Sequence, residues 1–348
     1  MKDLFITLVK IPSPSGGEQA MREFISDFLN KLKVKSSTDS AGNLLADLGG
    51  TGKRILMVAH MDTVQKPGEI VTPKFKNGTY FGDGSTILGA DNKAGVAILL
   101  TLAKELSQMR VRPKIYFAFT TNEEVGRMGS SQLNLKKIEP DFIINVDGNK
   151  SPGVVDVQGL GQTVFELEIK GKSAHAALEP GKGIHAIKMA ARIVTSLKMG
   201  KFADGSTLNI GQINGGTSTN VVPDKVSLKG EARAFSDIRL EEILLKVSRI
   251  SKTMVKTFPD YGVPVWDKSK DSSLVNVCKA AAKKAGVKFR IEAMLASSDA
   301  NYLARYGVPT INVNRGGANP HSYSESITLD EMEKTKEFLA KIIEGLWF

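Results

Sequence analysis

Short apolar runs alternate with amphipathic segments along the first 150 residues of the chain. The runs at 54–59, 114–120 and 141–146 are predicted as strands, and the segments at 18–33 and 92–107 carry apolar residues at helical spacing. Strands that alternate with helices are typical of a mainly parallel sheet with helices on both faces. The first part of the chain is therefore predicted to be an α/β domain.

The pattern changes near residue 160. The next hundred residues are predicted in the order strand, helix, strand, strand, helix, strand, with helices at 183–197 and 240–257 and the last strand at 263–266. That order matches the ferredoxin-like motif. A helix at 274–285, a buried strand at 310–313 and a helix at 329–346 then resume the first pattern.

Two domains are also expected from length, because 348 residues exceed what one hydrophobic core usually holds. We predict an α/β domain of residues 1–160 and 268–348, with an inserted ferredoxin-like α+β domain at residues 161–267.

Composition narrows the class of protein. Hydrophobic residues make up 41% of the chain, and no apolar run approaches the roughly 20 residues that a membrane span needs. Asp3 and Pro12 interrupt the first apolar residues, so we expect no secretion signal. A single cysteine, Cys278, excludes an intramolecular disulfide and is expected to be a buried core thiol. These features together favour a cytoplasmic location.

The formal net charge of +10 raises the question of nucleic acid, because basic surfaces attract phosphate. Lysines and arginines are scattered, however, and aromatic residues amount to only 7% of the chain. Without a basic block or an aromatic platform, we expect a solvated basic surface and neither a nucleic-acid nor a membrane partner.

His60 and Asp62 directly follow the apolar run RILMVA, at the expected carboxyl end of a strand, where open α/β sheets bind ligands. Residues two apart in an extended chain point the same way. Asp62 can therefore accept a hydrogen bond from one ring nitrogen of His60 while the other nitrogen binds a metal. On this spacing alone, a simple hydrogen-bonding pair is the commoner interpretation.

Three further acids follow predicted loops and strands. Asp91 stands between a small, polar loop, FGDGSTILGA, and a helix, where it could cap the helix or approach an ion. Glu123 and Glu124 follow the run KIYFAFTT and should face opposite ways. One carboxylate can then bind metal while the other addresses an attacking water, although adjacent surface acids are also common.

Asp147 ends the run DFIINV, and His321 lies in the turn-rich segment RGGANPHSYSES. With His60, Asp91 and Glu124 they make five nitrogen and oxygen donors, all expected at one edge of the sheet. Such donors without cysteine suit zinc, cobalt or manganese in a catalytic site. One carboxylate must bridge if five ligands serve two ions. We predict two Zn²⁺ ions, with Co²⁺ or Mn²⁺ as alternatives.

The same segments resemble a known family. The motifs AHMDTV, GADNKAG, TNEEVG, NVDG and the histidine of NPHS are similar to the ordered metal motifs of peptidase T-like enzymes. Those enzymes belong to the aminoacylase and carboxypeptidase G superfamily of two-zinc peptidases. The resemblance covers nearly the whole chain, and it implies a metallopeptidase that hydrolyses amide bonds of short peptides, as a tripeptide aminopeptidase does.

The resemblance implies a role for each donor. Asp91 would bridge the two ions, His60 and Asp147 would complete one metal site, and Glu124 and His321 would complete the other.

Two further residues of these motifs would take part in catalysis. By the resemblance, Glu123 would be the general base, which takes a proton from the attacking water and returns it to the leaving amine. Asp62 would support the metal ligands.

The segments GKSAHA, GGTSTNVVPD and EARAF are similar to lid motifs of the family, so the inserted domain would be a lid and dimerisation domain. By the resemblance His175 would contact the transition state. Asn220 and Arg233 could bind a substrate carboxylate or carbonyl, or be a turn residue and a solvent-facing strand residue respectively. His185 falls within the predicted helix at 183–197 and is assigned no role.

Three segments depart from the family. Asn92 follows Asp91 where many relatives have aspartate, and the closing histidine motif NPHSYSES differs from the peptidase T form. AMLASSD, at 293–299, replaces a glycine-rich stretch, which leaves the substrate-pocket contacts open.

Other functions remain as alternatives. The same metal chemistry would serve an N-acyl amino-acid amidohydrolase or a carboxypeptidase, because the pocket selects the amide. A non-catalytic protein is disfavoured by Glu123 and the complete ligand set, and a nucleic-acid binder by the scattered charge. We expect a homodimer through the inserted domain, with His175 acting on its own chain or on the partner.

Overall fold

A computed structural model describes residues 1–266 and 272–347 of the chain. The described residues form two compact units. The larger unit comprises those of Met1–Gln158, Lys268–Met294 and Ser298–Phe348, and the inserted unit those of Gly159–Asp267 and Leu295–Ser297. Within these described residues, no helix is both long enough and apolar enough to cross a membrane.

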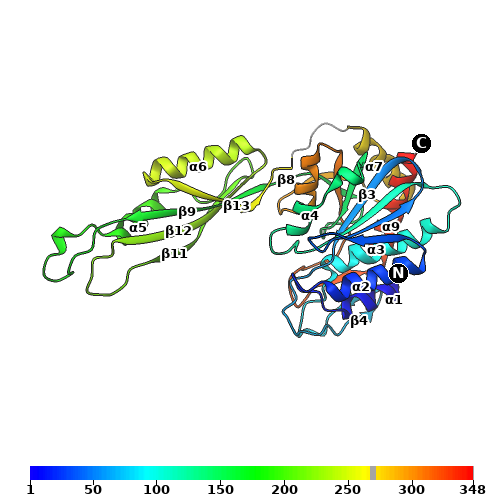
Figure 1. The fold of residues 1–348 in the computed structure, drawn as a ribbon, viewed down its shortest axis with the longest axis horizontal. Helices are drawn as coiled ribbons and strands as arrows, with labels where there is room; N and C mark the ends of the chain where they lie inside the picture. Colours follow the sequence, from blue (N-terminus) through cyan, green and yellow to red (C-terminus); the bar gives the residue numbers. More distant parts are fainter. Residues whose placement is uncertain (267–271, 348) are drawn as a thin grey trace. The chain divides into compact units, whose positions relative to one another are not determined.

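An eight-stranded sheet forms the centre of the larger unit (Figure 1). Its order is β1 (Lys35–Thr38), β2 (Leu44–Gly49), β6 (Pro113–Thr120), β3 (Thr51–His60), β7 (Phe142–Val146), β15 (Thr310–Val313), β8 (Val154–Gly159) and β14 (Arg290–Met294). The four central strands β6, β3, β7 and β15 are parallel, whereas β1, β2 and β8 pair antiparallel with their neighbours. The parallel centre gathers four strand carboxyl ends at one edge.

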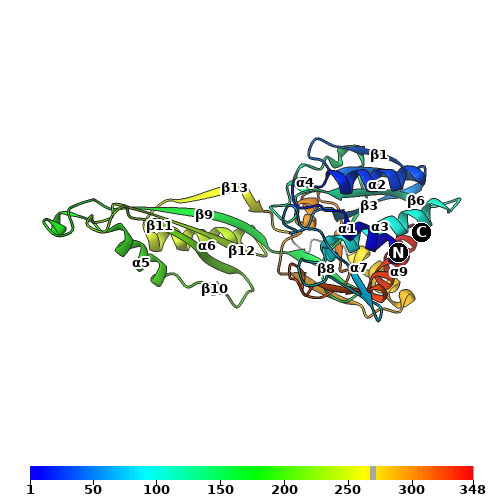
Figure 2. The ribbon, with the colours of Figure 1, turned by 90° about the horizontal axis from the view of Figure 1, so that it is seen from below.

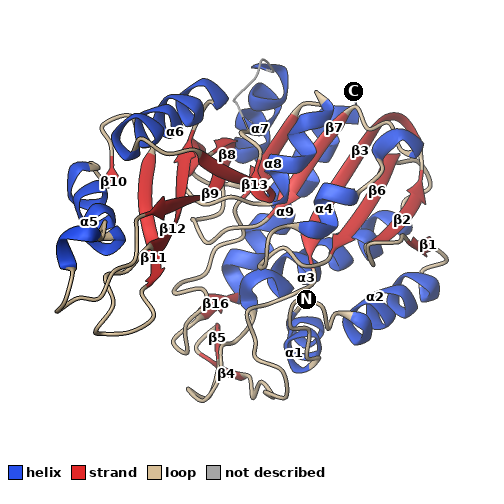
Figure 3. Cartoon of the chain, turned by 60° about the vertical axis from the view of Figure 1, so that its left-hand side comes forward, coloured by secondary structure: helices blue, strands red, loops and turns tan. Residues whose placement is uncertain are grey.

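Helices cover both faces of this sheet (Figure 3). Alternate residues of β3 show why: Ile55 and Met57 pack into one buried cluster, and Leu56 and Val58 into another. The first cluster includes α1 (Lys2–Lys10), α2 (Gln19–Lys31), α3 (Ala90–Ser107), α7 (Ser272–Ala285) and α9 (Leu329–Trp347). The second lies against α4 (Met128–Gln132), η1 (Leu135–Lys137) and α8 (Asp299–Leu303), which precedes η3 (Ala304–Tyr306).

The larger unit has a second, small sheet of β4 (Lys74–Lys76), β5 (Thr79–Phe81) and β16 (Ser326–Thr328). Cys278 is fully buried among the helices of the first cluster, as predicted.

The inserted unit has a five-stranded antiparallel sheet, in the order β10 (Gly200–Lys201), β11 (Thr207–Gly215), β12 (Lys225–Ala234), β9 (Gly161–Lys170) and β13 (Val255–Val263) (Figure 2). Helices α5 (Ala186–Ser196) and α6 (Asp237–Ser251) pack on the apolar face of this sheet, and η2 (Pro180–Lys182) precedes α5. The order β9, α5, β11, β12, α6, β13 is that of the ferredoxin-like motif. The predicted fold class is confirmed.

The two ends of the inserted unit lie next to each other. The Gly159 N–H donates to the Trp266 carbonyl oxygen at 2.8 Å, and the Trp266 N–H donates back to Gly159 at 3.2 Å. The long segment of this unit, which begins at Gly159, therefore returns to its starting point at Trp266.

The boundary between the last helix and the last strand of the inserted unit was predicted wrongly. The helix expected at 240–257 ends at Ser251, because Lys252 takes a left-handed conformation with φ of 52°. The last strand, expected at 263–266, instead begins at Val255 and pairs with β9. Apolar residues after Ser251 continue the helical spacing, so the pattern alone could not locate the break.

Candidate active site

The predicted metal ligands of the larger unit meet at the carboxyl edge of its parallel strands. His60 ends β3, Asp147 directly follows β7, and Asp91 lies at the start of α3. Glu124 is in the loop after β6, and His321 is between β15 and β16. Potential ligand atoms of the described residues lie within 4.8 Å of one another in three groups: His60, Asp91 and Asp147; Asp91, Glu124 and His321; and His60, Glu123 and Glu124.

Asp91 belongs to two of these groups through different oxygens. Its Oδ1 lies 3.5 Å from Nε2 of His60, and its Oδ2 lies 3.4 Å from Nε2 of His321. Asp147 Oδ1 is 3.9 Å from the same His60 nitrogen, and Glu124 Oε1 is 3.0 Å from the same His321 nitrogen. Each oxygen of Asp91 thus faces one cluster.

The other ring nitrogen of His60 faces Asp62. Nδ1 lies 3.0 Å from the Asp62 carbonyl oxygen and 3.4 Å from Asp62 Oδ1, and the His60 side chain is only 2% exposed. A proton on Nδ1 leaves the Nε2 lone pair directed at Asp91 and Asp147. This is the tautomer that a metal-binding histidine requires.

Asp62 also fixes the loop that carries the two glutamates. Its Oδ1 accepts a hydrogen bond from the Glu123 N–H at 3.0 Å. Its Oδ2 accepts from the Glu124 N–H at 3.1 Å and from the Ser15 hydroxyl at 2.7 Å. Burial alone would raise the pKa of Asp62, but hydrogen bonds from His60, Ser15 and Glu123 outweigh it and hold the pKa below its usual value. Asp62 is therefore a charged anchor for both glutamates.

Glu18 supports the same loop and was not predicted. Its Oε1 accepts from the Asn122 N–H at 2.9 Å and from the Gly16 N–H at 3.1 Å, and the residue is 4% exposed. Glu18 and Asp62 thus bind the N–H groups of three consecutive residues, 122 to 124. In the sequence Glu18 stands before a helix, where an acid looks like an ordinary helix start.

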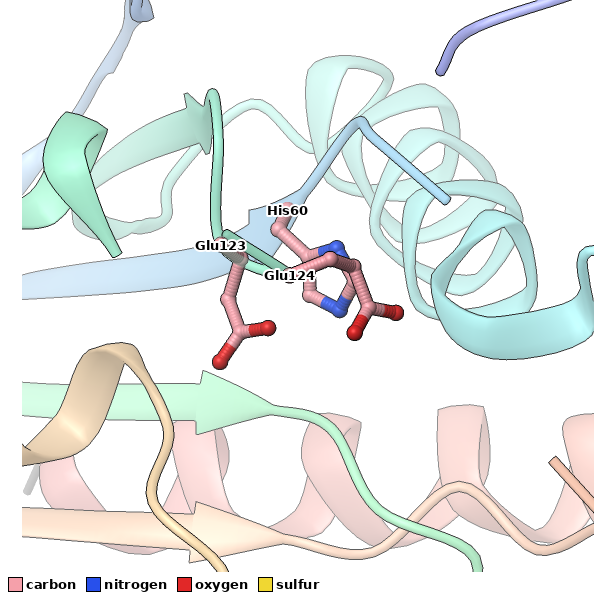
Figure 4. Close-up of side chains that lie close together, drawn as sticks. All are labelled: His60, Glu123 and Glu124. Atoms are coloured by element: carbon pink, nitrogen blue, oxygen red, sulfur yellow. The ribbon is translucent and has the colours of Figure 1, made fainter. Parts of the chain in front are cut away.

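The Glu123 carboxylate is buried beside Arg127, whose Nε lies 2.9 Å from Oε1. Burial raises the pKa of Glu123 well above its usual value, although the charges of Arg127 and His60 oppose the rise. Figure 4 shows the carboxylates of Glu123 and Glu124 at separate positions on either side of the His60 ring. The neighbouring glutamates therefore have different surroundings, as a base and a ligand would need.

Two buried residues hold Asp91 and were also not predicted. Arg315 Nη2 lies 2.8 Å from Asp91 Oδ1. Glu325 accepts from the Asp91 N–H at 2.9 Å and from the Gly89 N–H at 2.7 Å. Burial would raise the pKa of Asp91, but the charge of Arg315 and hydrogen bonds from His321 and His60 hold it well below its usual value. The peptide bond between Asp91 and Asn92 is cis.

The excess of negative charge fits a bound cation. Burial and the nearby Asp91 carboxylate raise the pKa of Asp147 to about 6. Hydrogen bonds with Asp91 and Glu124 raise the pKa of His321 to about 10. Protons are thus retained where acids crowd together, and nitrogen and oxygen donors of this kind suit divalent transition metals.

The three candidates of the inserted unit lie at two places within it. His175 pairs in an isolated bridge with Val221, and the Ala176 N–H donates to the Asn220 carbonyl at 2.9 Å. Arg233 lies near the far end of β12, where Nε is 2.9 Å from Glu231 Oε1. The eight residue-to-residue steps from Lys225, at the start of β12, to Arg233 span about 26 Å in an extended strand. The structure therefore places His175 beside Asn220 and separates Arg233 from both.

The His175 ring has one nitrogen engaged. Nδ1 accepts from the N–H groups of Ala177 and Leu178, each at 3.2 Å, so the ring proton belongs on Nε2. His185, expected inside a helix, instead caps it: its Nδ1 accepts from the Lys188 N–H at 3.3 Å and α5 begins at Ala186. The side-chain hydrogen bond to the first turn explains the later start.

Comparison with known proteins identifies the architecture. Residues 56–345 match Peptidase family M20/M25/M40. The uncharacterized Bacillus subtilis protein YqjE is 32% identical over 361 residues, which cover 98% of this chain and 96% of that protein.

Two solved structures are similar over almost their whole length. Aminopeptidase PepT from Bacillus cereus has a TM-score of 0.91 at 30% identity, and a tripeptidase from Staphylococcus aureus has a TM-score of 0.92 at 26% identity. In both cases 99% of this chain and 97% of the other are covered. The resemblance predicted from the motifs is confirmed, and the chain belongs to Peptidase family M20/M25/M40.

Proposed function

We propose that the chain is a two-metal aminopeptidase that hydrolyses short peptides with a free amino terminus, tripeptides in particular. The observation that carries the proposal is Asp91, whose two carboxylate oxygens each face one cluster of candidate ligands. The similarity to an aminopeptidase and to a tripeptidase supports the choice of substrate.

The residues that would hold the ions follow from the two clusters. His60, Asp91 and Asp147 would hold one, and Asp91, Glu124 and His321 would hold the other. Zinc is the preferred metal, with cobalt or manganese as alternatives. When bound, the metals supply polarisation of the scissile carbonyl and acidify the attacking water.

Glu123 supplies the proton transfers. Its carboxylate takes the proton of the attacking water and then delivers it to the nitrogen of the leaving amine. Arg127 and the hydrogen bond from the Glu123 N–H to Asp62 keep this side chain in place. A fixed base avoids the loss of rate that follows from a misplaced group.

The inserted unit would act as a lid and as the dimer interface, with His175 as an additional donor to the oxyanion. Apolar side chains stand exposed at or near α5 and on β11: Ile184, Ile187, Met189 and Ile213. A group of exposed apolar residues of this kind suits a self-complementary contact. A cytoplasmic location is proposed with the same function, in line with the single cysteine.

The test compares substrates on one preparation. The chain is stripped with a chelator, reloaded separately with Zn²⁺, Co²⁺ or Mn²⁺, and assayed on trialanine, N-acetyltrialanine and N-acetylalanine. We expect trialanine to be cleaved fastest, and a tripeptide with different end residues, Leu-Gly-Gly, to release leucine from its amino end. Faster hydrolysis of N-acetylalanine would assign the chain to the amidohydrolases instead, and release from the carboxyl end would make it a carboxypeptidase.

A further inference from the structure

Arg315 is a buried cation inside the candidate metal centre. It follows β15 after one residue, and its side chain is only 1% exposed. Each nitrogen of its guanidinium has an oxygen partner: Nη2 with Asp91 Oδ1 at 2.8 Å, Nε with Asn92 Oδ1 at 3.1 Å, and Nη1 with the Gly316 carbonyl at 2.9 Å. The guanidinium therefore cannot turn away from Asp91 without losing its hydrogen bonds to Asn92 and to the Gly316 carbonyl.

The closest contact of the guanidinium is with one oxygen of the Asp91 carboxylate. Asp91 Oδ1, its partner, is the oxygen that faces His60, and Oδ2 faces His321 instead. An ion held by His60, Asp91 and Asp147 would share Oδ1 with Arg315. An ion held by Asp91, Glu124 and His321 would not.

Because Asn92 is uncharged, it binds Arg315 without neutralising it, and the positive charge can act on Asp91. Asn92 Nδ2 donates to the Val146 carbonyl at 2.8 Å, and its Oδ1 accepts from the Gly95 N–H as well as from Arg315. An aspartate at this position could not donate to Val146 and would neutralise the guanidinium. With asparagine at position 92, the nearest carboxylate that can pair with the Arg315 guanidinium is Asp91.

We propose that Arg315 is a permanent positive charge within the metal centre. It holds Asp91 in its bridging position and makes the two metal positions unequal in affinity. The ion at His60, Asp91 and Asp147 binds more weakly than the ion at Asp91, Glu124 and His321. The physical reason is that two cations at one carboxylate oxygen repel each other and divide its charge. The inference rests on the proposed two-metal function.

The proposal is tested by isothermal titration calorimetry, in which Mn²⁺ is titrated into the chelator-treated full-length chain. The wild-type chain should show two binding events whose dissociation constants differ by about tenfold or more, as expected for a nearby fixed charge. His60→Ala should abolish the weaker event, and His321→Ala the tighter one. Arg315→Met, which removes the charge, should tighten the weaker event by about tenfold and narrow the gap.

Two further variants separate charge from packing. Arg315→Lys keeps the charge and should keep the wide gap. Asn92→Asp neutralises the guanidinium without removing it and should tighten the weaker event, which keeps the proposal testable if Arg315→Met does not fold. Arg54→Met is the control, because Arg54 pairs with Glu139 and Asp141 away from the centre and should leave both events unchanged.

Equal Mn²⁺ affinities of the two metal positions in the wild-type chain would overturn the proposal. The proposal would also be overturned if Arg315→Met or Asn92→Asp, shown by circular dichroism to be folded, bound the weaker ion no more tightly than the wild-type chain does. In those cases two ions are still bound, and the proposed function survives. A wild-type chain that binds no metal would overturn both.

Discussion

The two units of the chain hold their candidate residues in opposite ways. In the larger unit, His60, Asp62 and Glu123 are almost fully buried and fixed by hydrogen bonds or ion pairs to one another or to nearby groups. In the inserted unit, His175 and Asn220 are exposed at one end, and Arg233 lies at the other. The first set is held together by its own hydrogen bonds and ion pairs, whereas the second is not gathered at one place.

The largest effect should come from Glu123. We expect Glu123→Gln to lower kcat by about a thousandfold or more while the metal content stays near normal, because the base is lost and no ligand is touched. Asp91→Ala should lose metal as well as activity. Metal analysis beside steady-state kinetics checks both, and an equally depleted Gln variant would show that base and ligand were wrongly assigned.

His175 tests whether the inserted unit contributes to chemistry at all. We expect His175→Ala to lower kcat by about a hundredfold, the usual effect of losing an oxyanion donor, with metal content unchanged. The measurement is kcat on trialanine beside metal analysis.

Subunit exchange decides on which chain His175 acts. If it acts across a dimer, mixing His175→Ala chains with Glu123→Gln chains restores about a quarter of the wild-type sites, because mixed dimers have one intact site. If it acts within its own chain, every site carries one lesion and mixing recovers nothing. A monomer by light scattering excludes the dimer.

Glu18 tests how firmly the larger unit must hold its base. Glu18→Ala removes the acceptor of the Asn122 N–H, so the loop that carries Glu123 should loosen and kcat should fall by about tenfold. Glu18→Gln keeps an oxygen acceptor and should restore most of the activity. If the Gln variant were as slow as the Ala variant, the charge of Glu18 and not its hydrogen bonds would matter.

Metal removal should lower the stability of the larger unit and leave that of the inserted unit unchanged. Each ion at 100 times its dissociation constant would stabilise the larger unit by about 3 kcal/mol, because it binds only the folded state. Chelation should therefore speed amide hydrogen exchange in α3 and β7 and leave β9 and β12 unchanged. Equal acceleration in both units would mean that they unfold together.

Much of the fold could be predicted because its main elements have clear apolar periods. The runs before His60, Glu123 and Asp147 became β3, β6 and β7, and their parallel pairing gathers these residues at one edge. Short strands with weak alternation, such as β1 and β14, carried too little signal.

Parts of the site could not be predicted because their partners are distant in sequence. Glu325 binds the N–H of Gly89, 236 residues away, and Arg315 pairs with Asp91 across a similar separation. No local pattern marks such residues: Glu325 looks like a loop acid, and Arg315 looks like a surface cation. Only the tertiary packing shows that both are buried around Asp91.

The mutual hydrogen bonds of Gly159 and Trp266 have an evolutionary meaning. Because the segment from Gly159 to Trp266 starts and finishes at hydrogen-bonded neighbours, a short connection could replace it and leave the parallel strands in place. The larger unit could therefore be kept in evolution while this segment is shortened or exchanged.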